Sequence, residues 1–194
     1  MSHNKKSDKR IKSTKEYIDA LSKKHSKIAI VRVDLGYKKP YSDSVTLDEA
    51  NNDFNRMMNN RRSKPSVFKE QVGYLCKREY TQDKGVHLHV VIIYDGQKIQ
   101  KDAFKANQIG NYWEELTEDK GSYHRCNPND YKHNGIGILD HRDKDKRKIL
   151  DEHVIPYLCK EEQDIQPLKG SKKDRVFTRG TIKKDEKKKG RPRS

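Results

Sequence analysis

Two long apolar segments that follow each other in the chain constrain its fold more than any other feature. Residues 70–80 (EQVGYLCKREY) and 85–94 (GVHLHVVIIY) are rich in the β-branched and aromatic residues that favour strands, and only a short polar link separates them. Such a pair predicts a β-hairpin near the middle of the chain. The segments on either side then decide which fold surrounds this hairpin.

The other segments show the periodicities of strands and helices in a regular order. We expect a strand at 27–35 and a helix at 46–58, which begins with a capping box formed by Thr46 and Glu49. After the hairpin come a helix at 102–116, short strands at 121–126 and 135–139, and a helical segment at 144–163 that bends or restarts at Pro156. The order strand, helix, strand, strand, helix, strand is that of the split βαβ or ferredoxin-like fold. We therefore predict an α+β protein whose antiparallel sheet has helices packed on one face.

The net charge of +15 is concentrated at the two ends of the chain. Residues 1–15 carry a net charge of +5 and residues 169–194 carry +9, so the segment between them is close to neutral. We expect one domain at 27–168, between a basic N-terminal arm at 1–26 and a basic C-terminal tail, with both ends disordered. Lys-rich ends of this kind serve either solubility or a sequence-independent attraction to nucleic-acid phosphates.

The cysteines and the apolar runs indicate a compartment. The chain has three cysteines and no CxxC pair, which favours a reducing environment over a disulfide framework or a zinc knuckle. No stretch resembles a signal peptide, and no apolar run approaches the length of a membrane span. We expect a cytoplasmic protein without a membrane partner.

Two histidines interrupt the second strand of the predicted hairpin. His87 and His89 are two positions apart, so both imidazoles project from the same face of the strand, which we expect to be the open face of the sheet. Glu79, at the end of the preceding strand, can return beside them. Two imidazoles and a carboxylate suit a divalent ion such as Mg²⁺ or Mn²⁺ and leave coordination positions open. Considered separately, the same residues favour a simpler interpretation, namely satisfied histidines in a sheet and a carboxylate facing solvent.

A third motif follows in the last predicted helix. Tyr157 and Lys160 are three residues apart, which places the phenol and the ammonium on one side of a helix. Alone, this pair favours a core tyrosine beside a solvated lysine.

In this order, however, the three motifs resemble those of the HUH endonucleases, the replication initiators, relaxases and transposases that nick single-stranded DNA. An acidic residue comes first, then His-hydrophobe-His, then Tyr-x-x-Lys roughly seventy residues later. The segments GVHLHVVIIYDG, QIGNYW, NGIGIL and FTRG are also similar to the inovirus-type replication proteins, the YagK/YfjJ-like group, and this resemblance covers approximately residues 27–180. With a single tyrosine in its last motif, the chain resembles the single-tyrosine type.

The resemblance implies an HUH endonuclease fold and a mechanism. Glu79, His87 and His89 would hold the divalent metal ion. Tyr157 would be the nucleophile and form a 5′-phosphotyrosyl intermediate, and Lys160 would lower the pKa of the tyrosine or stabilise charge on the phosphate. The implied function is a metal-dependent nickase and strand transferase that initiates rolling-circle replication of a phage, plasmid or integrated element.

The resemblance also implies partners. Single-stranded DNA or an origin hairpin would be the substrate, and because the chain has no GxxxxGK[ST] motif, a host helicase and a host polymerase would act with it. The oligomeric state is not indicated. Arg175 and Arg179, together with Lys183 and Lys184 of the tail, are candidates for contacts with phosphates. Asp34 is a candidate for an extra acidic ligand, although a charge at a strand end is the simpler interpretation.

Two other functions use the same residues. A single-tyrosine transposase would apply the same chemistry to join DNA ends, and a non-catalytic nucleic-acid-binding regulator would keep only the fold. The near-neutral charge between the two ends favours a local active site over a broad binding surface, and so favours an enzyme.

Overall fold

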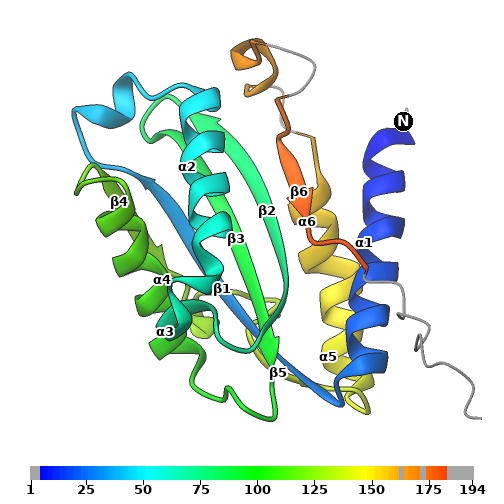
Figure 1. Cartoon of the computed structure of the whole chain (residues 1–194). Coiled ribbons are helices and arrows are strands. Elements are labelled where there is room, and N and C mark those ends of the chain that lie inside the picture. The colour runs from blue at the N-terminus through cyan, green and yellow to red at the C-terminus, as the bar shows by residue number, and fades with distance from the viewer. Residues whose placement is uncertain (1–4, 162–163, 171–173, 183–194) are drawn as a thin grey trace, which may run out of the picture.

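A six-stranded antiparallel sheet forms the centre of the molecule (Figure 1). The computed structural model describes residues 5–161, 164–170 and 174–182 of the chain. The strands are β1 (Lys27–Tyr37), β2 (Gln71–Thr81), β3 (Gly85–Asp95), β4 (Gly121–Arg125), β5 (Gly137–Asp140) and β6 (Phe177–Arg179). Their order is β4-β1-β3-β2-β6, and β5 pairs with the beginning of β1. The α+β class and the antiparallel sheet are as the sequence predicts.

The hairpin of β2 and β3 sets the register on which the polar residues of the sheet depend. Glu79 lies directly opposite His87, and Lys77 lies opposite His89. The turn ends at Gly85, whose φ of 65° suits glycine, and a Cβ there would lie 2.0 Å from the carbonyl oxygen of Ser42. The predicted hairpin is confirmed.

One face of the sheet is covered by α2 (Leu47–Asn59), α3 (Pro65–Phe68) and α4 (Asp102–Leu116). The capping box predicted at the start of α2 is present, since Thr46 and Glu49 exchange hydrogen bonds. Trp113 of α4 is fully buried, and its ring N–H donates to the carbonyl of Gly36. This face forms the larger of two apolar cores. Single 3₁₀ turns connect several elements, among them η2 (Asn60–Arg62) between α2 and α3.

The other face also carries helices, which the prediction of helices on one face did not include. They are α1 (Lys5–Lys24), α5 (Lys144–Ile149), a π-helical turn, η4 (Leu150–Val154), and α6 (Ile155–Cys159). Residues of α1, η4 and α6 pack on the apolar side chains of β1, β2 and β3 in a second core, seen on the right of Figure 1. Among the described residues, no helix combines the length and apolar character needed to cross a bilayer.

The expectation of a disordered N-terminal arm at 1–26 is wrong for residues 5–24, which form α1. Thr14, Tyr17 and Ile18 are at most 1% exposed, so this helix is part of the fold. The reason is a stripe at helical spacing, Ile11, Thr14, Ile18 and Leu21, set among lysines. A sum of the charges over residues 1–15 does not detect this amphipathic pattern.

The predicted domain end at residue 168 is also too early. The short strand β6 adds to the edge of β2, and the backbone N–H of Arg78 donates to the carbonyl of Val176 at 2.8 Å. Val176 is 5% exposed. The expected tail at 169–194 therefore contributes a strand to the sheet, while residues 183–194 lie outside the described part of the chain.

Candidate active site

A polar half of the second sheet face lies beyond the end of the helical cover. On each of the three central strands, an apolar residue under the helices has a polar residue two positions away on the same face. These pairs are Ile30 and Arg32 on β1, Leu75 and Lys77 on β2, and Val91 and His89 on β3. Along each strand, the same face therefore changes from apolar to polar. The predicted metal ligands lie in the polar part.

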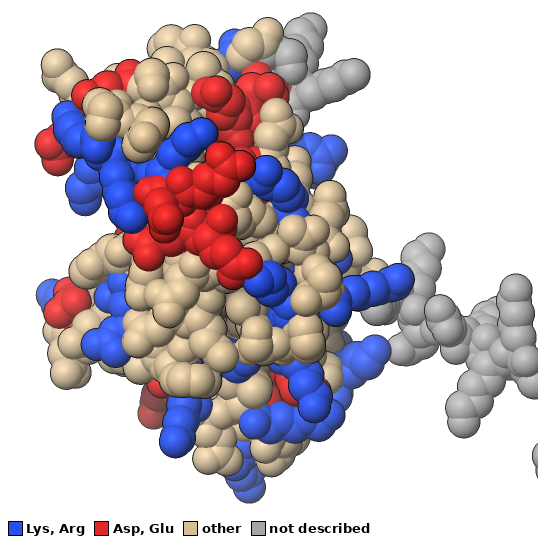
Figure 2. Space-filling view, turned by 60° about the vertical axis from the view of Figure 1, so that its left-hand side comes forward, with Lys and Arg blue, Asp and Glu red and all other residues tan. Residues whose placement is uncertain are grey.

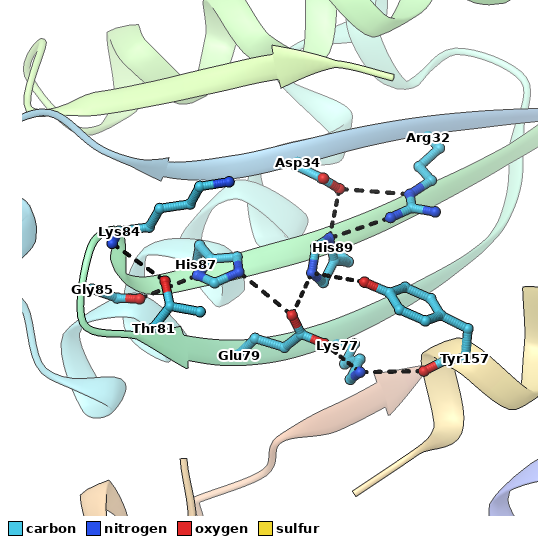
Figure 3. A network of polar contacts seen from close by, with 10 residues as sticks. All are labelled: Arg32, Asp34, Lys77, Glu79, Thr81, Lys84, Gly85, His87, His89 and Tyr157. Carbon is cyan, nitrogen blue, oxygen red and sulfur yellow. Dashed lines mark hydrogen bonds and ion pairs between the residues drawn. The ribbon is translucent and has the colours of Figure 1, made fainter. Parts of the chain in front are cut away.

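Glu79, His87 and His89 lie together in this polar half (Figure 3). One ligand atom from each residue lies within 4.8 Å of the others. The carboxylate oxygen Oε2 of Glu79 is 2.8 Å from Nε2 of His89 and 3.5 Å from Nε2 of His87. The two imidazole rings stand nearly perpendicular, with centroids 5.2 Å apart. The structure therefore brings together the three residues that the sequence singles out.

The hydrogen bonds of the two Nδ1 atoms determine which ring nitrogen of each histidine faces Glu79. Nδ1 of His87 lies 3.1 Å from the carbonyl oxygen of Gly85, and because a carbonyl only accepts, this nitrogen carries the proton. Nδ1 of His89 donates to a carboxylate oxygen of Asp34 at 2.8 Å. Both Nε2 atoms are thus directed at the site. A carboxylate behind a histidine is a common support for a metal ligand, and this donor set fits a divalent cation.

Asp34 is therefore not the strand-end charge that the sequence favours. It lies opposite His89 in the pairing of β1 with β3 and supports that imidazole from the side away from Glu79. Its own pKa is lowered, because the hydrogen bond from His89 and the charges of His89 and Arg32 outweigh the effect of burial, which raises it.

The cluster shifts the protonation of its members in opposite directions. Burial raises the pKa of Glu79, but hydrogen bonds from His87, His89 and Lys77 outweigh it and hold that pKa far below its usual range. Burial lowers the pKa of His89, but its hydrogen bonds to Asp34 and Glu79 reverse the effect and raise it. Without a cation, the proton of His89 is stabilised between two carboxylates. A divalent cation would have to displace that proton.

Tyr157 approaches the same cluster from α6. Its hydroxyl is 3.5 Å from Nε2 of His89, and its ring centroid is 5.8 Å from that of His89. Tyr157 is 42% exposed, so solvent reaches this residue beside the cluster. Pro156, which is awkward in the middle of a regular helix, is the second residue of α6, and α6 directly follows the π-helical turn η4.

Lys160 makes no polar contact with the cluster among the described residues. Helix α6 ends at Cys159, and Lys160 is its C-cap residue, whose backbone N–H donates to the carbonyl of Pro156. Lys160 is exposed, and within the described residues its ammonium forms no hydrogen bond or ion pair. The structure does not bring this predicted residue into the cluster.

Two cations that the sequence analysis missed lie beside Tyr157 instead. Lys77 is 2% exposed and forms an ion pair with Glu79, and its ammonium lies 4.7 Å from the ring centroid of Tyr157 and 3.2 Å from its carbonyl oxygen. The guanidinium of Arg32 lies 5.4 Å from the same ring and 4.9 Å from that of Tyr131. The sequence offers a signal that both residues have a role, because each is a basic side chain within a buried strand.

Lys77 and Arg32 only partly offset the groups that raise the pKa of Tyr157. Burial and then the charge of Glu79 raise the pKa of Tyr157, while Arg32 and Lys77 lower it, and the net shift is upward. The phenol is therefore protonated near neutral pH in the absence of a metal ion.

The predicted phosphate-binding residues lie elsewhere. Arg175 is exposed before β6. Arg179 lies on β6 with its guanidinium 5.2 Å from the ring centroid of Tyr17, and it donates to the carbonyl of Gly180 at 2.8 Å. Neither arginine contacts the Glu79 cluster within the described residues. Lys183 and Lys184 lie outside those residues.

Comparison with known proteins gives one match. The model of the YagK/YfjJ C-terminal domain family matches residues 1–177, a stretch that includes α1 and every residue of the cluster. No curated protein and no solved structure matches the chain.

Proposed function

This chain belongs to the YagK/YfjJ C-terminal domain family, and from its side-chain cluster we propose that it is an HUH endonuclease. It nicks single-stranded DNA with the help of a divalent ion, Mn²⁺ or Mg²⁺, and starts rolling-circle replication of a phage, plasmid or integrated element. The observation that carries this proposal is the hydroxyl of the partly exposed Tyr157, which lies 3.5 Å from the imidazole of His89 in a cluster whose three donors fit a metal ion.

The residues divide the work in the proposed reaction. Glu79, His87 and His89 would hold the cation, which would supply positive charge against the scissile phosphate. The oxygen of Tyr157 attacks the phosphorus, and the bond from phosphorus to the 3′-oxygen breaks. The phenol proton passes to solvent, which reaches this side chain, and the departing 3′-oxygen takes a proton from solvent. The products are a 5′-phosphotyrosyl protein and a free 3′-hydroxyl that can prime synthesis.

We assign to Lys77 and Arg32 the electrostatic role that the motif gives to Lys160. Both lie against the ring of Tyr157, and both lower the pKa of its hydroxyl. Glu79 opposes them, since its negative charge is the second cause that raises this pKa. A cation held by Glu79 would offset this negative charge and so favour the phenolate, while Lys77 and Arg32 are placed to stabilise charge on the phosphate.

The test is a search for the covalent product. The full-length protein is mixed with Mn²⁺ and 3′-labelled single-stranded fragments of the DNA that flanks its own gene, and a denaturing gel is used to detect label that migrates with protein. Tyr157→Phe keeps the ring and removes the hydroxyl, so we expect it to abolish the adduct. Tyr131→Phe is the matched control, because the ring of Tyr131 also lies against Arg32, and it should leave the adduct intact.

Two results would overturn the proposal. An adduct that peptide mapping places on another tyrosine would remove Tyr157 as the nucleophile. Cleavage of the DNA without any adduct would mean that water attacks the phosphate.

A further inference from the structure

A basic pocket lies at the end of β2 that is away from Glu79. It has a volume of about 540 Å³ and is open to solvent. The end of α1, the turn η2, the start of β2 and the segment after β6 form its walls, and Figure 1 shows this last segment running from β6 towards α1. Gly73, in the pocket wall, and Glu79 are six positions apart on β2, a span of roughly 20 Å. The pocket is therefore distinct from the Glu79 cluster.

The charged residues that line the described pocket are all basic or potentially basic. They are Lys24, His25, Arg61 and Arg179. The imidazole of His25 lies 3.5 Å from a carboxylate oxygen of Asp95, and Arg179 is held against Tyr17. Lys24 is exposed, and within the described residues its ammonium forms no hydrogen bond or ion pair. Arg61 donates to a carbonyl only through Nε, at 2.7 Å. Most of the N–H groups of these two cations are thus available to an anion.

Tyr17 adds a fixed hydroxyl to the pocket wall. Its oxygen accepts a hydrogen bond from the backbone N–H of Tyr74 at 3.3 Å, and within the described residues no acceptor faces the hydrogen that it carries. Gly73 and Gly180 make room for it, since a Cβ at these positions would lie 2.6 Å and 2.1 Å from the hydroxyl oxygen. A buried hydroxyl with an unused hydrogen, beside four basic groups, is suited to an anionic oxygen.

We propose that this pocket binds backbone phosphates of a nucleic-acid strand, as a second contact apart from the Glu79 cluster. The cations come from separate elements around an open pocket, an arrangement that suits a strand passing through more than an enclosed small ion. The chain continues from Ile182, in the pocket wall, into residues 183–194, whose seven Lys or Arg and two Asp or Glu give a net charge of +5.

The opposite charge gathers on another side of the molecule. Figure 2 turns the left side of Figure 1 forward and shows a group of Asp and Glu side chains there. The wall of a second pocket includes the acidic residues Glu49, Asp53 and Glu118 together with the basic residues Arg56 and Lys120. Repulsion from that side favours an approach of nucleic acid from the basic side. The inference does not depend on the nicking reaction, because it concerns binding alone.

The chain offers a matched pair of variants for the test. Lys24→Gln with Arg61→Gln removes two cations from the pocket wall. Lys23→Gln with Arg62→Gln removes the same two charges at neighbouring exposed positions that do not line it. Binding of a fluorescent single-stranded oligonucleotide is measured by anisotropy in EDTA, over a range of salt concentrations, with thermal melts to confirm folding.

We expect the pocket variant to bind about tenfold more weakly at low salt, with a slope of log affinity against log salt that is smaller by about 1. The affinity of the control should stay within about twofold of the parent's, because Lys23 and Arg62 do not line the pocket. General attraction to phosphates alone would not depend on which neighbouring cations are removed. Equal losses in both variants would show only general attraction and would overturn the proposal. If inorganic phosphate stabilises the parent but not the pocket variant, and both bind DNA equally, the site takes a small anion and the proposed strand contact is wrong.

Discussion

At the scale of single residues, the cluster depends on which nitrogen of each histidine carries the proton. Asp34 fixes this for His89 by accepting the proton of Nδ1 at 2.8 Å. Replacing Asp34 by Asn should therefore lower the affinity for Mn²⁺ by about 10–100-fold, because the amide no longer fixes the ring or raises its basicity. Titration calorimetry measures the change. Asp53→Asn is the control, since Asp53 accepts a hydrogen bond from Tyr37 at the other side of the sheet and should leave Mn²⁺ binding unchanged. Equal affinities for the parent and Asp34→Asn would remove Asp34 from the site.

A second prediction at this scale separates the two lysines. Lys77→Met should slow adduct formation by about 100-fold near neutral pH, while Lys160→Met should change it by less than about threefold. Lys77 lowers the pKa of Tyr157, so its loss raises that pKa and leaves less phenolate at a given pH. The rate of Lys77→Met should therefore recover towards higher pH, and its pH profile should shift to the alkaline side of the parent's. If Lys160→Met were the slower variant, the sequence motif would describe the site better than the geometry does.

The sequence identifies only part of this cluster, for a physical reason. His87 and His89 share a face because of strand alternation, which is local, and Glu79 follows from the hairpin. Asp34 gains its role from the long-range pairing of β1 with β3, which no local pattern gives. The motif singled out Lys160, whereas the cations beside Tyr157 are Lys77 and Arg32, which come from β2 and β1 through long-range packing.

At the scale of elements, α1 is the largest departure from expectation. Ile18 is 1% exposed and packs with α6 residues on the second sheet face. Ile18→Ala should lower the free energy of unfolding by about 2–5 kcal/mol, since it leaves a cavity in this core. Urea denaturation measures it, and Glu16→Ala, an exposed change on the same helix, should cost less than about 0.5 kcal/mol. If Ile18→Ala had an equally small effect, α1 would not be packed as part of the fold, and the disordered arm that the charge pattern suggests would be correct.

The elements whose periodicity is strong were predictable, and those set by packing were not. The hairpin and α2, with its capping box, follow from local patterns. The segment at 144–163 reads as one bent helix, yet it contains a π-helical turn before α6. That turn changes which residues face the sheet, so the placement of Tyr157 follows from tertiary packing on the second core. The three-residue strand β6 is too short to give an alternation signal.

At the scale of the whole molecule, the chain ends carry most of the net charge. Deleting residues 183–194 removes seven cations and two anions but keeps β6 and the walls of the basic pocket. If the tail attracts phosphates, single-stranded DNA should bind more weakly at low salt, and the slope of log affinity against log salt should fall by about 0.7 for each phosphate that the protein no longer neutralises. Anisotropy measures both quantities.

The same deletion should leave adduct formation at saturating DNA unchanged, because Tyr157 and the side chains that contact it lie outside the deleted segment. A gel assay at a DNA concentration well above the dissociation constant of the truncated protein tests this. Combined with the Lys24 and Arg61 changes, the deletion should weaken binding further than either change alone, provided that tail and pocket bind different phosphates. Loss of the adduct at saturating DNA would instead mean that residues 183–194 contribute to the reaction itself, and the tail would then belong to the active site.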